Sequence, residues 1–328
     1  MIRFAVMTDL HTDIIHDGRR RVHDFVQEAN RCGCDFVIQL GDFIQPEFIG
    51  SCVCSKDRIS AVMTNILAGK GLRAQEKQAI WEELRKFHGS LYHVIGNHDL
   101  DLYTKEEIMH YWGMTAPYYS FDQKGFHFVV PDANYGEENG QEISFARGNY
   151  MKWMFQEKEP FPYIPQKELE WLEQDLQNTD KPTIVFSHEG LNEGFLNAVN
   201  HEQIFEILKN APAGVLLCIC GHKHENRFES EQGIPAYFVN SMSGYSVPPM
   251  YAQKRFSDEI EDRYPNVKYM CVYEDPLFAV VTIDAEKISI QGRSSAFVPP
   301  SPQEMNMTLG GGKIKFSAEA GSVEIPRI

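Results

Sequence analysis

Five short apolar runs, each ending in a polar cluster, mark the first 220 residues of the chain. The runs are rich in β-branched residues and four to six residues long, as expected of buried strands. They cover residues 2–7, 36–40, 91–95, 183–186 and 215–220. These five runs are therefore predicted to be the central strands of the fold.

Amphipathic segments separate most of these runs. After the first run, apolar Val22, Phe25 and Ala29 recur at three- and four-residue steps, which places them on one face of a helix. Helices are predicted over residues 19–31, 74–87, 105–112, 166–177 and 201–209. Strands that alternate with helices in this way predict a layered α/β fold.

A second group of strands lacks intervening helices, so mixed pairing is predicted for it. The first two of its members are close enough in sequence to form a hairpin. The group covers residues 118–121, 126–130, 236–240, 278–283 and 288–292.

Two long segments, 134–165 and 243–276, contain many aromatic residues and charges but show no periodicity. Loops of this length inside a compact domain are commonly functional, so both are expected to be insertions that shape a substrate site. Their aromatic side chains either stack on a substrate base or cover the sheet, and packing is the favoured interpretation. These residues include Tyr135, Tyr150, Trp153, Phe155, Tyr245 and Tyr251.

The predicted domain spans residues 1–298. The tail, 299–328, begins with prolines, contains three consecutive glycines and then alternates apolar with polar residues. This pattern predicts a linker followed by a docking hairpin.

The charge balance restricts the partners of the protein. Among 328 residues, 46 acidic side chains face 31 basic ones, giving a formal charge of -15. A field of that sign repels nucleic-acid polymers and anionic membranes, whereas bound cations would still attract a small phosphorylated substrate. We therefore expect a small-molecule substrate, with neither a nucleic-acid polymer nor a membrane as partner.

The sequence also predicts a cytoplasmic location. The apolar runs are too short to span a bilayer, and the first residues lack the pattern of an export signal. Seven cysteines at scattered spacings indicate a reducing compartment. The close pairs Cys32/Cys34 and Cys52/Cys54 have a one-residue gap that is unusual for structural zinc, so ordinary packing is favoured for them.

Each of the five central runs is followed directly by residue types that bind metals. The clusters are Asp9-Leu10-His11, Gly41-Asp42, Gly96-Asn97-His98-Asp99, Ser187-His188 and Gly221-His222-Lys223-His224. Functional groups gather beyond the carboxyl ends of parallel strands, so all five clusters are expected to meet at one site. Mixed oxygen and nitrogen ligands suit manganese, iron or zinc, and so many ligands suit two ions rather than one.

These clusters, in this order, resemble the motifs of the calcineurin-like metallophosphoesterases. The resemblance implies an α/β fold in which two mixed β-sheets pack face to face between helices, a four-layer α/β/β/α sandwich. It also implies two groups of metal ligands and one shared ligand. Asp9, His11 and His224 would hold one ion, Asn97, His188 and His222 the other, and Asp42 would bridge. One departure is Gln45, where the family often has an aspartate.

Hydrolysis at such a centre proceeds by in-line attack of a hydroxide shared by the two ions. His98 neighbours Asn97 but is not a ligand in the pattern, so it is predicted to be the donor that stabilises or protonates the leaving oxygen. Asp99 is predicted to orient the His98 ring. Among the remaining histidines, His93 and His127 are expected to be packed or hydrogen-bonded, while His16 is a lesser candidate for substrate contact.

The stretches 92–99, 118–121 and 125–130 more loosely resemble the branch of cyclic-nucleotide phosphodiesterases and manganese-dependent ADP-ribose or CDP-alcohol diphosphatases. They favour a small, nucleotide-like phosphodiester or pyrophosphate as substrate. A phosphomonoesterase or phosphoprotein phosphatase is the nearest alternative. A nuclease would need a basic track, and a scaffold like the retromer subunit of this fold would not need so complete a ligand set.

Overall fold

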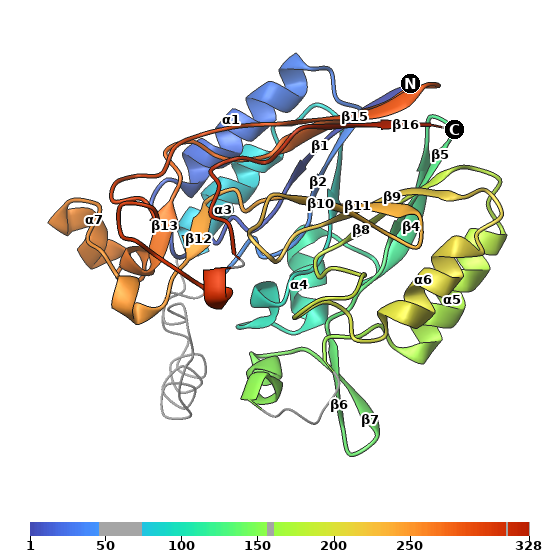
Figure 1. The fold of residues 1–328 in the computed structure, drawn as a ribbon, viewed down its shortest axis with the longest axis horizontal. Helices are drawn as coiled ribbons and strands as arrows, with labels where there is room; N and C mark the ends of the chain where they lie inside the picture. Colours follow the sequence, from blue (N-terminus) through green and yellow to red (C-terminus); the bar gives the residue numbers. More distant parts are fainter. Residues whose placement is uncertain (46–73, 156–160, 313, 328) are drawn as a thin grey trace.

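The computed structural model describes residues 1–45, 74–155, 161–312 and 314–327, so Cys52 and Cys54 lie outside it. Two six-stranded sheets pack against each other, and helices cover their outer faces (Figure 1). None of the helices in the described ranges is long and apolar enough to cross a membrane.

The first sheet has the strand order β16-β15-β14-β1-β2-β3. Strands β1, β2 and β3 run parallel, and β14, β15 and β16 extend the sheet in antiparallel fashion from β1. Their bounds are Ile2–Met7 for β1, Phe36–Gln39 for β2, Ser90–His93 for β3, Ala279–Ile283 for β14, Lys287–Gly292 for β15 and Val323–Pro326 for β16.

The second sheet has the order β10-β11-β9-β8-β5-β4, with four parallel strands between two antiparallel edges. The predicted hairpin is formed by β4 and β5. The bounds are Tyr119–Gln123 for β4, Phe126–Val130 for β5, Thr183–Ser187 for β8, Val215–Cys220 for β9, Arg227–Glu231 for β10 and Ile234–Phe238 for β11.

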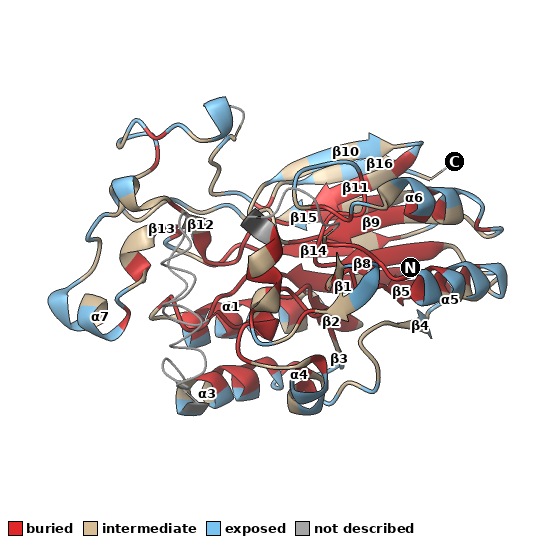
Figure 2. Cartoon of the chain, turned by 90° about the horizontal axis from the view of Figure 1, so that it is seen from below, coloured by how far each residue is buried: buried red, intermediate tan, exposed pale blue. Residues whose placement is uncertain are grey.

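Alternation along the strands builds the four layers. In β1, Phe4 and Val6 belong to the core between the sheets, whereas Ala5 and Met7 belong to the core beneath the helices. Successive side chains point to opposite faces of a strand, so both faces of β1 are buried (Figure 2). The predicted four-layer α/β/β/α fold is confirmed.

Each sheet has its own helices. Residues of α1, α3 and α4 pack in the apolar cluster on the outer face of the first sheet, and α5 and α6 pack on the second. The helices span Gly18–Arg31 for α1, Ala74–Leu84 for α3, Lys105–Trp112 for α4, Gln166–Gln177 for α5 and His201–Lys209 for α6. All five lie where helices were predicted, although α3 ends three residues early.

Both insertions contain short regular elements that their lack of periodicity did not predict. The first forms the hairpin β6–β7 and the 3-10 segment η2. The second forms the paired strands β12 and β13 with short helices between them. The bounds are Tyr135–Glu138 for β6, Gln141–Ser144 for β7, Asn149–Phe155 for η2, Gly244–Ser246 for β12, Pro249–Tyr251 for η3, Asp258–Arg263 for α7, Val267–Tyr269 for η4 and Met270–Val272 for β13.

The C-terminal tail packs on the domain, but not as the predicted hairpin. Within its described residues, 299–312 and 314–327, β16 is the one strand, and it pairs with β15 at the edge of the first sheet. Before it come the 3-10 turn η5 (Gly310–Gly312) and an apolar cluster in which Met307 packs with Val247 and Cys271 of the second insertion. The alternating segment does not pair with another described part of the tail; as β16, it pairs with β15 of the first sheet.

An ion-pair cluster around the buried His127 ring links β5 to β4 and α5. The two ring nitrogens of His127 each lie 2.8 Å from a carboxylate oxygen, one of Asp122 and one of Asp175. Burial alone would lower the histidine pKa, but the hydrogen bonds and charges of the two carboxylates outweigh burial and raise it. His127 is thus hydrogen-bonded, as predicted.

This cluster makes stability depend on pH. Because the folded-state pKa of His127 exceeds the unfolded value of about 6.5, its stabilisation is fully present below that value. It is lost as the pH rises through the folded-state pKa. We expect His127→Gln to lower the free energy of unfolding more at about pH 6 than at about pH 9, measured by urea denaturation. The exposed His88→Gln serves as control, and an equal loss at both pH values would contradict the assignment.

Candidate metal centre

All predicted ligands lie just beyond the carboxyl ends of parallel strands. Asp9, Asp42 and Asn97 follow β1, β2 and β3 of the first sheet, whereas His188 follows β8 and His222 follows β9 of the second sheet. The face-to-face packing of the sheets brings these loops together. The site therefore draws on both sheets of the sandwich.

The backbone at these loops is unusual. Eleven non-glycine residues in the described part of the chain have a positive φ, and five of them belong to the predicted ligand set. Such conformations cost roughly 1–3 kcal/mol each and cluster where function requires a particular side-chain direction. The five are Asp9, His11, Asp42 and His224, each at 53°, and His222 at 68°.

Two glycines allow the loops to approach closely. A Cβ on Gly96 would lie 2.3 Å from the backbone nitrogen of Asp42, and one on Gly221 would lie 2.1 Å from Oγ1 of Thr8. No side chain fits at either distance. The Gly-Asn-His and Gly-His motifs thus begin with glycine for steric reasons.

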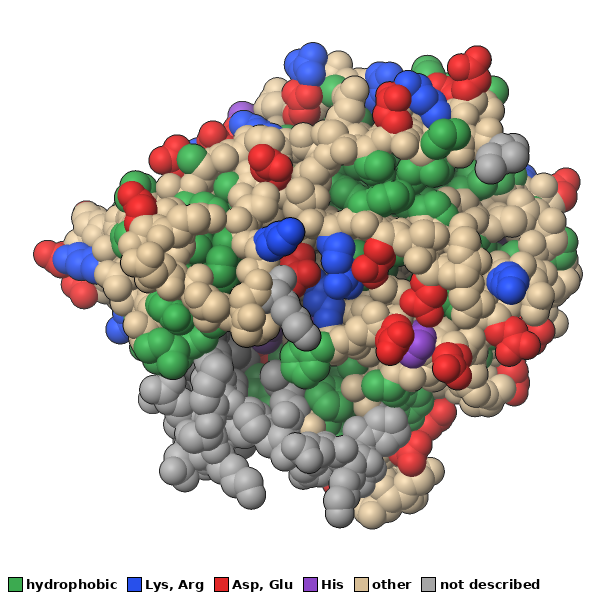
Figure 3. Space-filling view, viewed as in Figure 1, with side chains coloured by type: hydrophobic (Ala, Val, Ile, Leu, Met, Phe, Trp, Pro, Cys, Tyr) green, Lys and Arg blue, Asp and Glu red, His purple; other side chains and the backbone are tan. Residues whose placement is uncertain are grey.

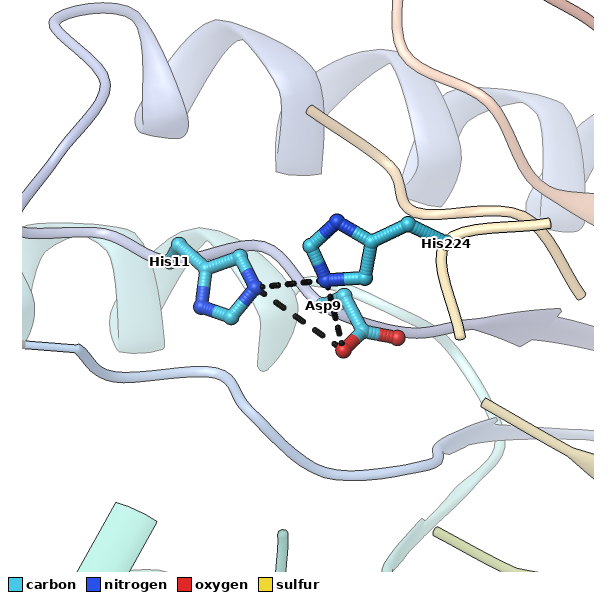
Figure 4. A group of neighbouring side chains, drawn as sticks. All are labelled: Asp9, His11 and His224. Atoms are coloured by element: carbon cyan, nitrogen blue, oxygen red, sulfur yellow. Dashed lines mark hydrogen bonds and ion pairs between the residues drawn. The ribbon is translucent and has the colours of Figure 1, made fainter. Parts of the chain in front are cut away.

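Asp9, His11 and His224 form the first group (Figure 4). Nε2 of His224 lies 3.2 Å from Oδ1 of Asp9 and 3.0 Å from Nε2 of His11. The other ring nitrogen of His224, Nδ1, donates to the carbonyl of Gly244 at 2.9 Å. That bond leaves Nε2 as a bare lone pair that faces the other two residues.

Asp42, His188 and His222 form the second group. His188 Nδ1 donates to the carbonyl of Leu40 at 2.7 Å, so Nε2 is the ring nitrogen left to bind either a second proton or a metal ion. This atom lies 3.3 Å from Oδ2 of Asp42 and 3.2 Å from Nδ1 of His222. Oδ1 of Asn97 is 3.2 Å away, which adds the predicted amide to the group.

Both groups fit a metal ion by the chemistry of their donors. In each, lone pairs of carboxylates and imidazoles point at one another inside the protein, an arrangement that only a proton or a cation relieves. Mixed nitrogen and oxygen donors are typical of transition metals. Within the described ranges these are the two candidate clusters, and the cysteine pair Cys32/Cys34 forms none.

The carboxylates dominate the electrostatics of the site. Burial would raise the pKa of Asp9 and of Asp42, but neighbouring histidines outweigh it and hold both pKa values well below the usual range. Burial likewise would lower the pKa of His188, yet Asp42 and Asp9 raise it well above normal. Burial and His224 lower the pKa of His11 to about 3. The site therefore carries a concentrated negative potential that favours cations.

Asp99 does not orient His98, so that prediction is wrong. Its carboxylate accepts hydrogen bonds from three backbone amides, those of Asp42 and Gly96 at 2.9 Å and that of Ile44 at 3.0 Å. Burial and the nearby Asp42 raise the pKa of Asp99 to about 8. Asp99 instead ties the loop after β2 to the loop after β3.

Asp101 is the carboxylate that holds His98. Its Oδ2 lies 2.7 Å from His98 Nδ1. The two residues are three apart on the 3-10 turn η1 (His98–Leu100) and its flank, where positions i and i+3 share a face but i and i+1 do not. Burial would lower the pKa of His98, but Asp101 and Asp42 outweigh it and raise that pKa to about 9. Gln45 lies on the other side, with its Nε2 3.5 Å from His98 Nε2.

The aromatic residues of the insertions mostly pack, as the favoured interpretation held. Tyr150 and Trp153 are buried, and Tyr135 lies under the ammonium of Lys105. The ring of Tyr245 lies edge-on to His224, with centroids 6.2 Å apart. Phe155 has a side chain outside the described set.

Two predicted histidine environments are also visible. His93 is buried, as expected, with its ring 5.0 Å from that of Trp81. Burial lowers its pKa to about 3, so the ring is neutral. His16, the lesser candidate for substrate contact, packs its ring 4.5 Å from Phe256 of the second insertion.

The family model of the calcineurin-like phosphoesterases matches residues 2–226, which contain all five metal-ligand clusters. The chain belongs to this family and is a metal-dependent hydrolase of phosphoester bonds.

One protein of similar sequence and two solved structures of similar fold show which proteins the chain resembles. The manganese-dependent ADP-ribose/CDP-alcohol diphosphatase of Arabidopsis thaliana is 23% identical over 296 residues, covering 74% of this chain and 83% of its own. A dimetal phosphatase from Danio rerio has a similar structure, with a TM-score of 0.61 at 16% identity over 90% of this chain and 98% of its own. GAP50 of Plasmodium, described as the anchor in the inner membrane complex, reaches 0.50 at 15% identity over 89% and 84%.

Proposed function

We propose that the chain hydrolyses a small, nucleotide-like phosphodiester or pyrophosphate at a dinuclear metal centre. One observation carries this proposal: two largely buried groups of histidine and aspartate, each with its ligand atoms close together, lie where five strand ends meet. Seven residues would hold the ions. They are Asp9, His11, Asp42, Asn97, His188, His222 and His224.

Hydrogen bonds within the protein fix the orientation of the proposed ligand carboxylates. Oδ2 of Asp9 accepts from the Thr8 hydroxyl at 2.6 Å and from the His222 amide at 3.0 Å, which directs Oδ1 to the first group. Oδ1 of Asp42 accepts from the His98 amide at 2.8 Å, while Oδ2 faces His188. Such bonds fix each ligand before an ion arrives.

Manganese, iron or zinc ions bound there would polarise phosphoryl oxygens and make water acidic enough to supply a nucleophile near neutral pH. His98 is proposed as the acid for the leaving oxygen. Its Nδ1 is committed to Asp101, so Nε2 is the atom that would give up the proton.

The proposed substrate class is supported by the surface charge and by the similarity to the Arabidopsis diphosphatase. On the face shown in Figure 3, the basic side chains of the described residues lie among acidic ones rather than in a track. A polymer of phosphates would find little attraction there. The Arabidopsis relative is named for ADP-ribose and CDP-alcohols, and these are pyrophosphates of nucleotides.

A hydrolysis screen with manganese tests the substrate class. It compares ADP-ribose, a CDP-alcohol, cyclic nucleotides, an aryl diester and an aryl monoester. We expect the highest kcat/KM for a nucleotide pyrophosphate or diester. Preference for the monoester would replace the proposal by a phosphomonoesterase, and no hydrolysis of any compound would reject the enzymatic proposal.

Asp42→Asn tests the bridging role. The change keeps the size of the side chain but removes the charge that two ions would share, so we expect lower manganese content and a loss of kcat/KM beyond the roughly 10–100-fold typical of residues behind the ligands. Metal analysis and steady-state kinetics measure both. Asp35→Asn, one residue before β2, is the control and should change neither the manganese content nor kcat/KM. Two retained ions per chain in Asp42→Asn would refute the bridge.

His98→Ala tests the acid. The variant should keep its metals, because His98 is not among the proposed ligands, and lose turnover by about 10²–10⁴-fold on esters with poor leaving groups. Esters with good leaving groups need little protonation and should lose much less. The exposed His110→Ala is the control. Equal losses on both kinds of ester would argue against proton donation by His98.

A further inference from the structure

We propose that Tyr150, supplied by the first insertion, is a positioning residue whose single hydroxyl fixes both Asn97 and His98. The inference rests on the proposed function, because it assigns Asn97 to a metal and His98 to the leaving group. In this proposal the insertion supports residues of the metal centre, in addition to any contact with the substrate.

Tyr150 makes three close polar approaches with one oxygen. The hydroxyl donates to Oδ1 of Asp101 at 2.7 Å, and Nδ2 of Asn97 donates to the hydroxyl at 3.2 Å. Nδ1 of His98 is 3.1 Å from the same oxygen. The side chain is 3% exposed, so bulk water does not compete for these contacts.

The directions of these bonds follow from the groups involved. A phenol has a pKa near 10 and so keeps its one proton at neutral pH. The short contact to Asp101 uses that proton. The hydroxyl oxygen can then only accept, and Asn97 must offer it the amide nitrogen rather than the amide oxygen.

The consequence for Asn97 is a fixed amide orientation. With Nδ2 held by Tyr150, Oδ1 points to the opposite side, where it lies 3.2 Å from Nε2 of His188. Only the oxygen of an amide is a metal ligand of the kind expected here. Without the hydroxyl, the amide could rotate and present nitrogen to the ion.

The consequence for His98 passes through Asp101. One carboxylate oxygen receives the Tyr150 hydroxyl and the other lies 2.7 Å from His98 Nδ1. Tyr150 therefore holds Asp101 in the rotamer that keeps the proton on Nδ1, and Nε2 is left on the side of Gln45. The proposed ligand and the proposed acid share this support.

Backbone hydrogen bonds next to Tyr150 fix its position relative to the segment that follows His98. The Gly148 amide donates to the Leu100 carbonyl at 2.9 Å, and the Arg147 amide donates to the Tyr103 carbonyl at 3.1 Å. Both acceptors lie just beyond His98 in the chain. The ring of Tyr150 packs against Phe145, with centroids 5.1 Å apart.

Tyr150→Phe removes the hydroxyl and keeps the packing. We expect about 10–100-fold weaker manganese binding at one of two sites, measured by calorimetric titration of the 328-residue chain. We also expect a kcat about tenfold lower on poor leaving groups, with KM within about twofold. The matched control is Tyr163→Phe, which removes another buried hydroxyl of the same insertion that has no hydrogen-bond partner among the described residues. It should match the wild type.

A double-mutant cycle separates positioning from general destabilisation. Tyr150→Phe and Asp101→Asn should be non-additive in kcat, because they act on His98 through one chain of bonds. Additive losses would overturn this link. Wild-type manganese affinity in Tyr150→Phe would overturn the Asn97 link, even if the wild type hydrolysed none of the screened esters. Activity of the wild type together with unchanged kinetics in Tyr150→Phe would leave the proposed function standing and reject this inference.

Discussion

The structure is organised around the burial of two carboxylates that face histidine lone pairs. Asp9 and Asp42 are at most 1% exposed, and an unpaired charge at that depth would be very costly. The left-handed turns, the glycines at the loop contacts and the amide bonds to Asp99 all hold these groups in place. The chain accepts local backbone strain here because the surrounding layers of strands and helices fix each loop from behind.

The sequence predicted the fold and most of the site because both follow from short-range patterns. Strands buried on both faces appear as continuous apolar runs, and each run led directly to its ligand. Asp101 was missed because the nearer carboxylate, Asp99, was paired with His98, although adjacent residues on a turn point apart. Tyr150 had no local signal, since its contacts with Asn97 and Asp101 cross about 50 positions.

The two insertions and the tail were harder to predict for the same reason. Their elements are short, and tertiary contacts stabilise them more than local periodicity does. Met307 of the tail, for example, packs against Val247 and Cys271, and all three lie in segments that showed no clear pattern. The fold alone does not decide function either, since a structure of similar fold is described as an anchor in Plasmodium. The side chains at the five strand ends make that decision.

The place of β1 in the first sheet has a consequence for synthesis of the protein. β1 pairs with β2 on one side and with β14 on the other, so β1, once synthesised, waits for residues 279–283 to be made. At ordinary elongation rates of about 5–20 residues per second, that wait lasts on the order of tens of seconds. During it, one edge of an apolar strand stays open to pairing with other chains. Nascent and truncated chains should therefore depend on chaperones more than the finished protein does.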